Sequence, residues 1–307
     1  MVYQPHFESS FDGKQLNTSN WPAVDSARAV VYILHGMCEH SARYADFAHF
    51  MNGRGFHVYS HDHRGHGFTV DVKDQVAHAD DNDGWQLMLR DIDFRLETIR
   101  NQHPNLPIVL LGHSMGTLLA LSYLRNFPVK VSSVVLSALP ENLGALNTVG
   151  KMLADWQIKL LGPRSKAKLH NMLSFDTYNQ NFRPVTTPFD WLSRDEDIVL
   201  KYHRDPLCGQ CASAAFFRDL LNEVIEVYKP ENLKKLPKDL PYLLLAGGND
   251  PVVGKVWGFE KTLAIFKTHL HGLKSKIYHG ARHEIMNETN KDEVWQDIAN
   301  FFSTSVK

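Results

Sequence analysis

The chain has 307 residues, which is long enough for one large domain, or for a domain with an insertion, around a substantial core. Its 43% hydrophobic and 22% charged residues are ordinary for a globular protein, and a formal net charge of −1 gives no sign of a nucleic-acid partner. Three cysteines make no disulfide framework, the N-terminus has no basic segment before an apolar core, and no apolar run is long enough to span a bilayer, so we expect a cytoplasmic protein without a signal peptide.

The first part of the chain alternates short strands with a polar loop and a helix. Two strand-like pieces flank a turn signal at Asp12 and Gly13. Residues 29–34 are apolar throughout and predict a buried strand. The polar residues 35–41 follow as a loop, and a helix then runs to a stop near Gly53.

The same alternation continues through the next part of the chain. Residues 56–60 predict a strand and are followed by the polar segment 62–67. A helical pattern covers residues 85–102, and strands are predicted at 108–111 and 133–137. Strands that alternate with helices predict a mostly parallel central sheet with helices on both faces.

The alternation stops between residues 139 and 239. This stretch is rich in helix formers and has no convincing strand, whereas strands resume at 241–247 and 273–278. We therefore interpret residues 139–239 as an inserted helical cap, or lid, on an α/β core formed by residues 1–138 and 240–307.

A nucleophilic serine is predicted where the strand at 108–111 meets the helix at 117–124. The pattern Gly-x-Ser-x-Gly stands between them, with Ser114 at its centre. A turn this sharp brings Gly112 and Gly116 too close to their surroundings for a Cβ, and it holds the serine in a strained conformation that exposes its hydroxyl. A chance match is the alternative for the bare pattern, but the strand and helix around it favour the nucleophile.

The serine needs a histidine as general base and a carboxylate to orient that histidine. In the α/β-hydrolase architecture, which this arrangement resembles, the carboxylate and then the histidine follow the serine in loops after late strands. Asp250 follows the strand at 241–247 and is our candidate acid, with a turn-forming aspartate as the alternative. His283 follows the last strand and is the candidate base. Its rivals are His269, His271 and His279.

The oxyanion of an acyl-transfer intermediate needs two N–H donors. One is expected from Met115, the residue after the nucleophile, whose N–H lies at the start of the helix. The other is expected from the loop after the early buried strand, where we assign the N–H of Met37.

No metal or cofactor is predicted. His61, His63 and His66 look superficially like a metal cluster, but their spacing does not match the His-Glu-x-x-His type, and we interpret them as a polar loop beside the nucleophile. Cys208 and Cys211 form a single C-x-x-C without a second pair, which is weak support for zinc or redox chemistry.

These motifs resemble the α/β-hydrolase superfamily, and within it the monoacylglycerol lipase and lysophospholipase branch, which is grouped with serine aminopeptidase-like hydrolases. The resemblance rests on residues 35–44, 62–67, 112–116, 249–251 and 281–284, in the family's order. It implies the same triad and the same oxyanion donors as the reasoning above. Two departures are visible, because relatives usually have glycine where Cys38 and Thr117 stand.

We therefore expect a serine ester hydrolase that cleaves carboxylic esters of monoacylated lipids, lysophospholipids or monoacylglycerols, through an acyl-enzyme. A short-chain carboxylesterase and an aminopeptidase are alternatives on the same fold. A peptidase would need an acidic group in the cap to hold a free amine, and Glu223, Glu226 and Asp190 are candidates for it. A catalytically silent ligand-binding protein is the alternative of another class, and the oligomeric state stays open.

One predicted cap helix carries an apolar stripe, with basic residues at or beyond its end. The stripe consists of Leu146, Val149, Leu153, Trp156 and Leu160, and the basic residues are Lys159, Arg164, Lys166 and Lys168. We expect the stripe to pack on the core, as most amphipathic helices do. The alternative is a transient contact between the cap and a membrane surface.

Overall fold

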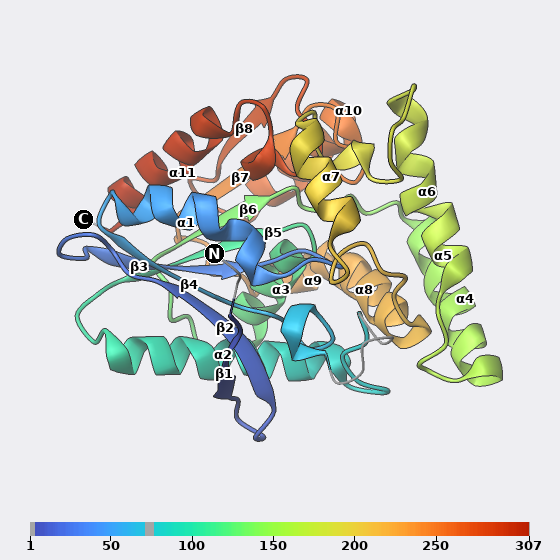
Figure 1. Cartoon of the computed structure of the whole chain (residues 1–307), viewed down its shortest axis with the longest axis horizontal. Coiled ribbons are helices and arrows are strands. Elements are labelled where there is room, and N and C mark those ends of the chain that lie inside the picture. The colour runs from blue at the N-terminus through green and yellow to red at the C-terminus, as the bar shows by residue number, and fades with distance from the viewer. Residues whose placement is uncertain (1–3, 71–76, 307) are drawn as a thin grey trace.

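The computed structural model describes residues 4–70 and 77–306, and its centre is one eight-stranded sheet (Figure 1). The strands follow the spatial order β1-β2-β4-β3-β5-β6-β7-β8. Their bounds are β1 His6–Ser9, β2 Gln15–Trp21, β3 Ala29–Leu34, β4 Phe56–His61, β5 Ile108–His113, β6 Ser133–Ser137, β7 Tyr242–Gly247 and β8 Lys274–Tyr278. Only β1 and β2 pair antiparallel to their neighbours within this sheet, and β3 through β8 are parallel. The predicted α/β-hydrolase class with a mostly parallel sheet is confirmed.

Helices cover both faces of the sheet, and its central strands are therefore buried on both sides. The helices of the core are α1 Ala45–Asn52, α2 Gly84–Gln102, α3 Met115–Asn126, α10 Lys255–Lys267 and α11 Lys291–Ser305. Apolar residues of α1 and α11 pack with one face, and those of α2, α3 and α10 pack with the other. Alternate residues of β3 serve the two faces: Val31 and Ile33 lie in one apolar cluster, and Tyr32 in the other.

The carboxyl ends of the parallel strands meet at one edge of the sheet, and the segment between β6 and β7 lies over this edge (Figure 1). This segment contains helices and no strand among its described residues. Its helices are α4 Ala145–Leu161, α5 Lys168–Leu173, α6 Phe175–Tyr178, α7 Glu196–Arg204, α8 Ala214–Val227 and α9 Pro230–Leu233. The division into a core and a cap at residues 139–239 stays an interpretation.

The apolar stripe on α4 does not pack on the core. Four of its five residues are exposed, namely Leu146, Val149, Trp156 and Leu160, and the exposed fraction of Trp156 is 63%. The side of α4 that faces inward is marked instead by Asn147 and Ala154, which are the residues of this helix that are buried. Our expectation about the stripe was therefore wrong. An apolar stripe shows that a helix has one apolar and one polar face, but it does not show which of the two faces packs against the rest of the protein.

No helix within residues 4–70 and 77–306 combines the length and the apolar character that crossing a bilayer requires.

Candidate active site

Ser114 lies between β5 and α3, in the sharp turn that the sequence predicts. Its φ of 51° and ψ of −116° are strained for a residue with a side chain. A Cβ on Gly112 would lie 2.4 Å from the carbonyl oxygen of Gly116, and a Cβ on Gly116 would lie 2.0 Å from that of Leu34. Both glycines are therefore required by close backbone approach, and the serine side chain is left facing the cavity described below.

Asp250 and His283 come together from the loops after β7 and β8. The imidazole Nδ1 of His283 lies 2.8 Å from Oδ2 of Asp250, and both side chains are buried. The other carboxylate oxygen of Asp250 accepts the backbone N–H of Val252 at 2.8 Å, which fixes the carboxylate. Burial alone would lower the pKa of His283, but the adjacent Asp250 carboxylate, together with Glu284 and Glu39, outweighs burial and raises this pKa above its ordinary value.

Met37 and Met115 both line the cavity beside Ser114. Met115 is the first residue of α3, so its N–H is one of those that the helix itself leaves without an acceptor. The N–H of Gly36 donates to Oε1 of Glu39 at 2.6 Å and is therefore already satisfied within its own loop. This arrangement suits Met37 and Met115 as a pair of donors near the serine.

A cavity of about 320 Å³ opens from Ser114 toward the segment between β6 and β7. Residues of the core that follow β3, β5, β7 and β8 line it on one side, and residues of helices α4, α6 and α8 line it on another. Most of the lining away from the serine is apolar, including Phe175, Phe217, Leu220, Leu221 and Val224.

Two aromatic side chains that the sequence analysis missed surround His283. The indole of Trp191, from the segment between β6 and β7, lies with its ring centroid 5.0 Å from that of His283. The imidazole of His113 lies 4.9 Å away on β5, and burial together with the nearby His283 lowers its pKa to about 4. A neutral ring at His113 avoids a second positive charge beside the base. Its place next to the serine in the motif was the available signal.

A buried ionic network behind the site was also missed. Arg43 donates from Nη1 to Oε2 of Glu39 at 2.5 Å, and it binds both carboxylate oxygens of Glu284 at 2.7 Å. Glu39 also accepts the hydroxyl of Tyr44 at 2.8 Å. The network therefore joins the loop that carries Met37 to the loop that carries His283. Glu39 and Arg43 lie in the conspicuous segment 35–44, but their partner Glu284 is remote in sequence.

The histidines at the end of β4 and in the segment after it are buried and pack beside His35, in the loop after β3. The rings of His61 and His63 have centroids 4.7 Å apart, and His63 lies 4.1 Å from the ring of His35. Burial lowers the pKa of His61 and His63 well below the ordinary value and that of His66 to about 3. These are packed, neutral rings, and their place beside the nucleophile stays an interpretation.

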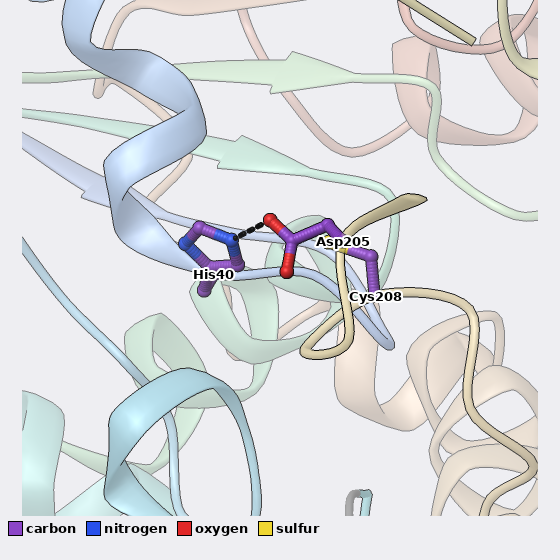
Figure 2. A group of neighbouring side chains, drawn as sticks. All are labelled: His40, Asp205 and Cys208. Carbon is purple, nitrogen blue, oxygen red and sulfur yellow. Dashed lines mark hydrogen bonds and ion pairs between the residues drawn. The ribbon is translucent and has the colours of Figure 1, made fainter. Parts of the chain in front are cut away.

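His40, Asp205 and Cys208 form the group among the described residues whose ligand atoms lie close enough to hold a metal ion, within 4.8 Å of one another (Figure 2). Its chemistry fits a metal poorly. His40 Nε2 and Asp205 Oδ2 already bind each other at 2.9 Å, and this hydrogen bond together with the charge of Arg43 lowers the pKa of Asp205. Burial raises the pKa of the Cys208 thiol, whereas a metal needs the thiolate. We therefore assign no metal to this group.

The chain matches known proteins over nearly its whole length. The family described as "Serine aminopeptidase, S33" matches residues 25–290. The monoglyceride lipase of Mus musculus is 30% identical over 291 residues, which are 92% of this chain and 84% of that protein. The monoacylglycerol lipase of Mycolicibacterium smegmatis is 27% identical and 98% of each chain is covered. A carboxyl esterase from Bacillus coagulans, solved in complex with glycerol, superposes with a TM-score of 0.86 at 25% identity, with all of both chains covered.

Proposed function

This chain belongs to the serine aminopeptidase S33 family of α/β-hydrolases, and from that premise we propose that it hydrolyses the carboxylic ester of a monoacylated lipid, a monoacylglycerol or a lysophospholipid. The observation that carries this proposal is the apolar cavity of about 320 Å³ that opens from Ser114. Long acyl chains need apolar walls, and this volume is within the range of about 300–1,000 Å³ typical of small-molecule sites.

The reaction assigned to the site proceeds through an acyl-enzyme. The Ser114 hydroxyl attacks the ester carbonyl while Nε2 of His283 takes its proton, and Asp250 holds the resulting imidazolium. The N–H groups of Met37 and Met115 stabilise the negative oxygen of the tetrahedral intermediate. The imidazolium then protonates the departing alcohol, and the same base activates a water molecule that releases the fatty acid.

The three acidic side chains that we considered for holding a free amine are each bound by other groups of the protein. Glu223 is buried in an ion pair with Arg125 at 2.6 Å. Glu226 binds Lys229 at 2.6 Å, and the carboxylate of Asp190 accepts the backbone N–H groups of residues 186 and 187. These contacts favour an ester over a peptide with a free amine as the substrate.

We also propose that the cap touches a lipid surface, since single-chain lipids reside in membranes and micelles. Nine large apolar side chains on α4 and α5 are exposed, namely Leu146, Val149, Met152, Trp156, Leu160, Leu161, Leu169, Met172 and Leu173. The basic residues Lys159, Lys166 and Lys168 beside them are exposed and would attract anionic head groups. A cytoplasmic location stays a prediction from the sequence.

The function is tested with purified protein, a fluorophosphonate probe and a series of esters. We expect the probe to label wild type and not Ser114→Ala. We also expect faster hydrolysis of p-nitrophenyl esters as the acyl chain lengthens, and turnover of monoacylglycerol or lysophosphatidylcholine. A protein that is folded but neither labelled nor active would be a ligand-binding protein, and a preference for acetate or for aminoacyl amides would support one of the other hydrolase functions.

The surface contact has its own test. Lys166→Glu with Lys168→Glu should weaken binding to anionic vesicles and slow hydrolysis of vesicle-borne substrate, but spare a soluble short ester. The matched control is Lys267→Glu with Lys274→Glu, two exposed lysines at the end of α10 and the start of β8, on the edge of the sheet opposite the site. Equal vesicle binding by both double variants and wild type would contradict the contact with lipid, and the cap would then only cover the active site.

A further inference from the structure

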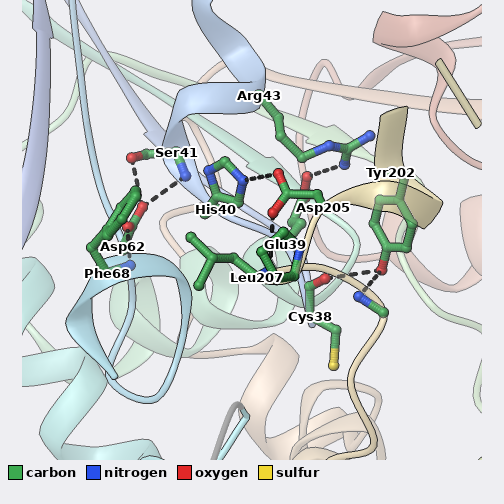
Figure 3. A network of polar contacts seen from close by, with 12 residues as sticks. Cys38, Glu39, His40, Ser41, Arg43, Asp62, Phe68, Tyr202, Asp205 and Leu207 are labelled. Atoms are coloured by element: carbon green, nitrogen blue, oxygen red, sulfur yellow. Dashed lines mark hydrogen bonds and ion pairs between the residues drawn. The ribbon is translucent and has the colours of Figure 1, made fainter. Parts of the chain in front are cut away.

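The loop that carries Met37 has a strained backbone at the next residue. Cys38 has a φ of 56°, in the left-handed region that costs a residue with a Cβ about 1–2 kcal/mol. The segment therefore needs contacts that hold it in place. They come from residues 202–210, which belong to the inserted segment between β6 and β7 (Figure 3).

The carbonyl oxygen of Cys38 accepts two hydrogen bonds from residues of the cap. The hydroxyl of Tyr202 donates to it at 2.9 Å, and the backbone N–H of Gly209 donates at 3.0 Å. The thiol of Cys38 donates in turn to the carbonyl oxygen of Gln210 at 3.0 Å. Burial raises the pKa of this thiol, so it stays protonated and remains a donor.

A second contact between the loop and the cap lies two residues further along, at His40. His40 binds Asp205 at 2.9 Å, and the other carboxylate oxygen of Asp205 accepts the backbone N–H of Leu207 at 2.9 Å (Figure 3). The next residue, Ser41, is fixed to the core instead, because both its N–H and its hydroxyl donate to Asp62. The loop is thus held between a carboxylate of the core and a carboxylate of the cap.

We propose that residues 202–210 of the cap position the oxyanion-binding loop, with Tyr202 and Asp205 as positioning residues that act on Met37 through Cys38 and His40. This inference rests on the proposed function of the site. It makes the cap a part of the machinery that stabilises the transition state, besides being the wall of the acyl pocket. Because the oxyanion forms only as the reaction proceeds, such contacts act on kcat and leave KM nearly unchanged.

The test compares Tyr202→Phe with Tyr228→Phe. Each variant loses one buried hydroxyl that donates to a backbone carbonyl, that of Cys38 at 2.9 Å or that of Pro140 at 2.8 Å. Both should therefore lower the melting temperature similarly. Only Tyr202→Phe should lower kcat for a soluble ester, by about 10-fold, which is less than the roughly 100- to 1,000-fold loss on removing an oxyanion donor outright.

A second readout follows the oxyanion directly. An alkyl trifluoromethyl ketone forms a tetrahedral adduct with the serine, and its inhibition constant should rise in Tyr202→Phe by the same factor as kcat/KM falls, and stay unchanged in Tyr228→Phe. Asp205→Ala, at a partly exposed side chain, should act in the same direction and decides the question if Tyr202→Phe does not fold.

Two results would overturn the inference in different ways. If wild type is active but Tyr202→Phe and Asp205→Ala match Tyr228→Phe in kcat and inhibitor binding, residues 202–210 have no positioning role. If KM rises while kcat is unchanged, these residues act on substrate binding instead. A wild type that is neither labelled by a fluorophosphonate nor active would refute the proposed function itself, and this inference with it.

Discussion

The guanidinium of Arg43 binds both carboxylate oxygens of Glu284, the residue that follows His283. It binds Glu39 at the same time, so one cation balances two buried carboxylates that belong to two different loops of the site. Burial would raise the pKa of Glu39, but Arg43 and the other neighbours outweigh it and hold this pKa well below its ordinary value. The Glu39 carboxylate therefore stays ionised, and its charge is tolerated in the interior because the Arg43 cation balances it.

Arg43→Ala should consequently be strongly destabilising, by about 3–5 kcal/mol, because it leaves buried charges without a counter-ion. Lysine at this position should recover part of the loss but not the bidentate geometry. Urea unfolding monitored by circular dichroism measures both. The control is Lys151→Ala, which breaks an exposed ion pair with Asp155 and should cost no more than about 1 kcal/mol. Equal midpoints for the two alanine variants would contradict the role of the network.

Ser114→Ala should abolish ester hydrolysis without unfolding the protein, since the serine is proposed as the nucleophile. His283→Ala should lose a similar factor, and the double variant little more, because the members of a triad act as a unit. Hydrolysis of p-nitrophenyl butyrate measures the losses, and His271→Ala, at an exposed histidine, is the control that should keep its activity. Near-normal turnover by a folded Ser114→Ala variant would remove the nucleophile assignment.

The rate should fall on the acid side of neutrality, because His283 must be neutral to accept the serine proton. Its pKa is raised by Asp250, so the midpoint of the fall in kcat/KM is expected above about 6.5, the ordinary value for histidine. Asp250→Asn should remove both this upward shift and most of the activity. A profile that stays flat down to about pH 4.5 would be incompatible with a histidine base.

Stability should fall in acid for a separate reason. The buried His61, His63 and His66 have lowered pKa values in the folded state, whereas the unfolded chain takes up protons below about pH 6.5. Their contribution is therefore complete above that pH and is lost as the pH falls below it, while the raised pKa of His283 acts in the opposite direction. The melting temperature should drop between pH 7.5 and pH 5. His66→Gln should flatten the slope, His271→Gln should not, and a melting temperature that rises toward pH 5 would refute the argument.

Replacing Cys38 separates strain from hydrogen bonding. Both Cys38→Ala and Cys38→Gly lose the thiol bond to Gln210, but only glycine relieves the left-handed backbone. Cys38→Gly should therefore be the more stable of the two by about 1 kcal/mol, as measured by denaturant midpoints. A more stable alanine variant would mean that φ at this position is not the source of strain.

Local patterns predicted the core well for physical reasons. Residues 29–34 form β3 with the predicted bounds, because an unbroken apolar run between polar segments fits a strand that is buried on both faces. The loops after β5, β7 and β8 also lie at one edge, as parallel strands require, so Ser114, Asp250 and His283 fall in one region although their roles stay predictions.

Contacts between residues far apart in the sequence, and the orientation of helices on the surface, could not be predicted from local patterns. Arg43 and Glu284 are 241 positions apart, and no periodicity links an arginine to one particular carboxylate at that distance. The hydrogen bond from the Tyr202 hydroxyl to the carbonyl oxygen of Cys38 depends on how the cap packs on the core, and residue spacing does not reveal this packing. The prediction that the α4 stripe packs on the core was wrong, because residue spacing shows that a helix has an apolar face but does not show whether that face meets the protein or the solvent.

The placement of the cap within the sequence has a consequence for how the protein folds. β6 and β7 are hydrogen-bonded neighbours, although residues 138–241 separate them. Closing so long a loop adds little to the equilibrium cost, since each doubling of length costs only about 0.6 kcal/mol. It does delay the pairing. During synthesis, β6 remains an open edge of a half-built sheet until β7 leaves the ribosome, and the nascent chain is exposed to edge-to-edge association throughout that interval.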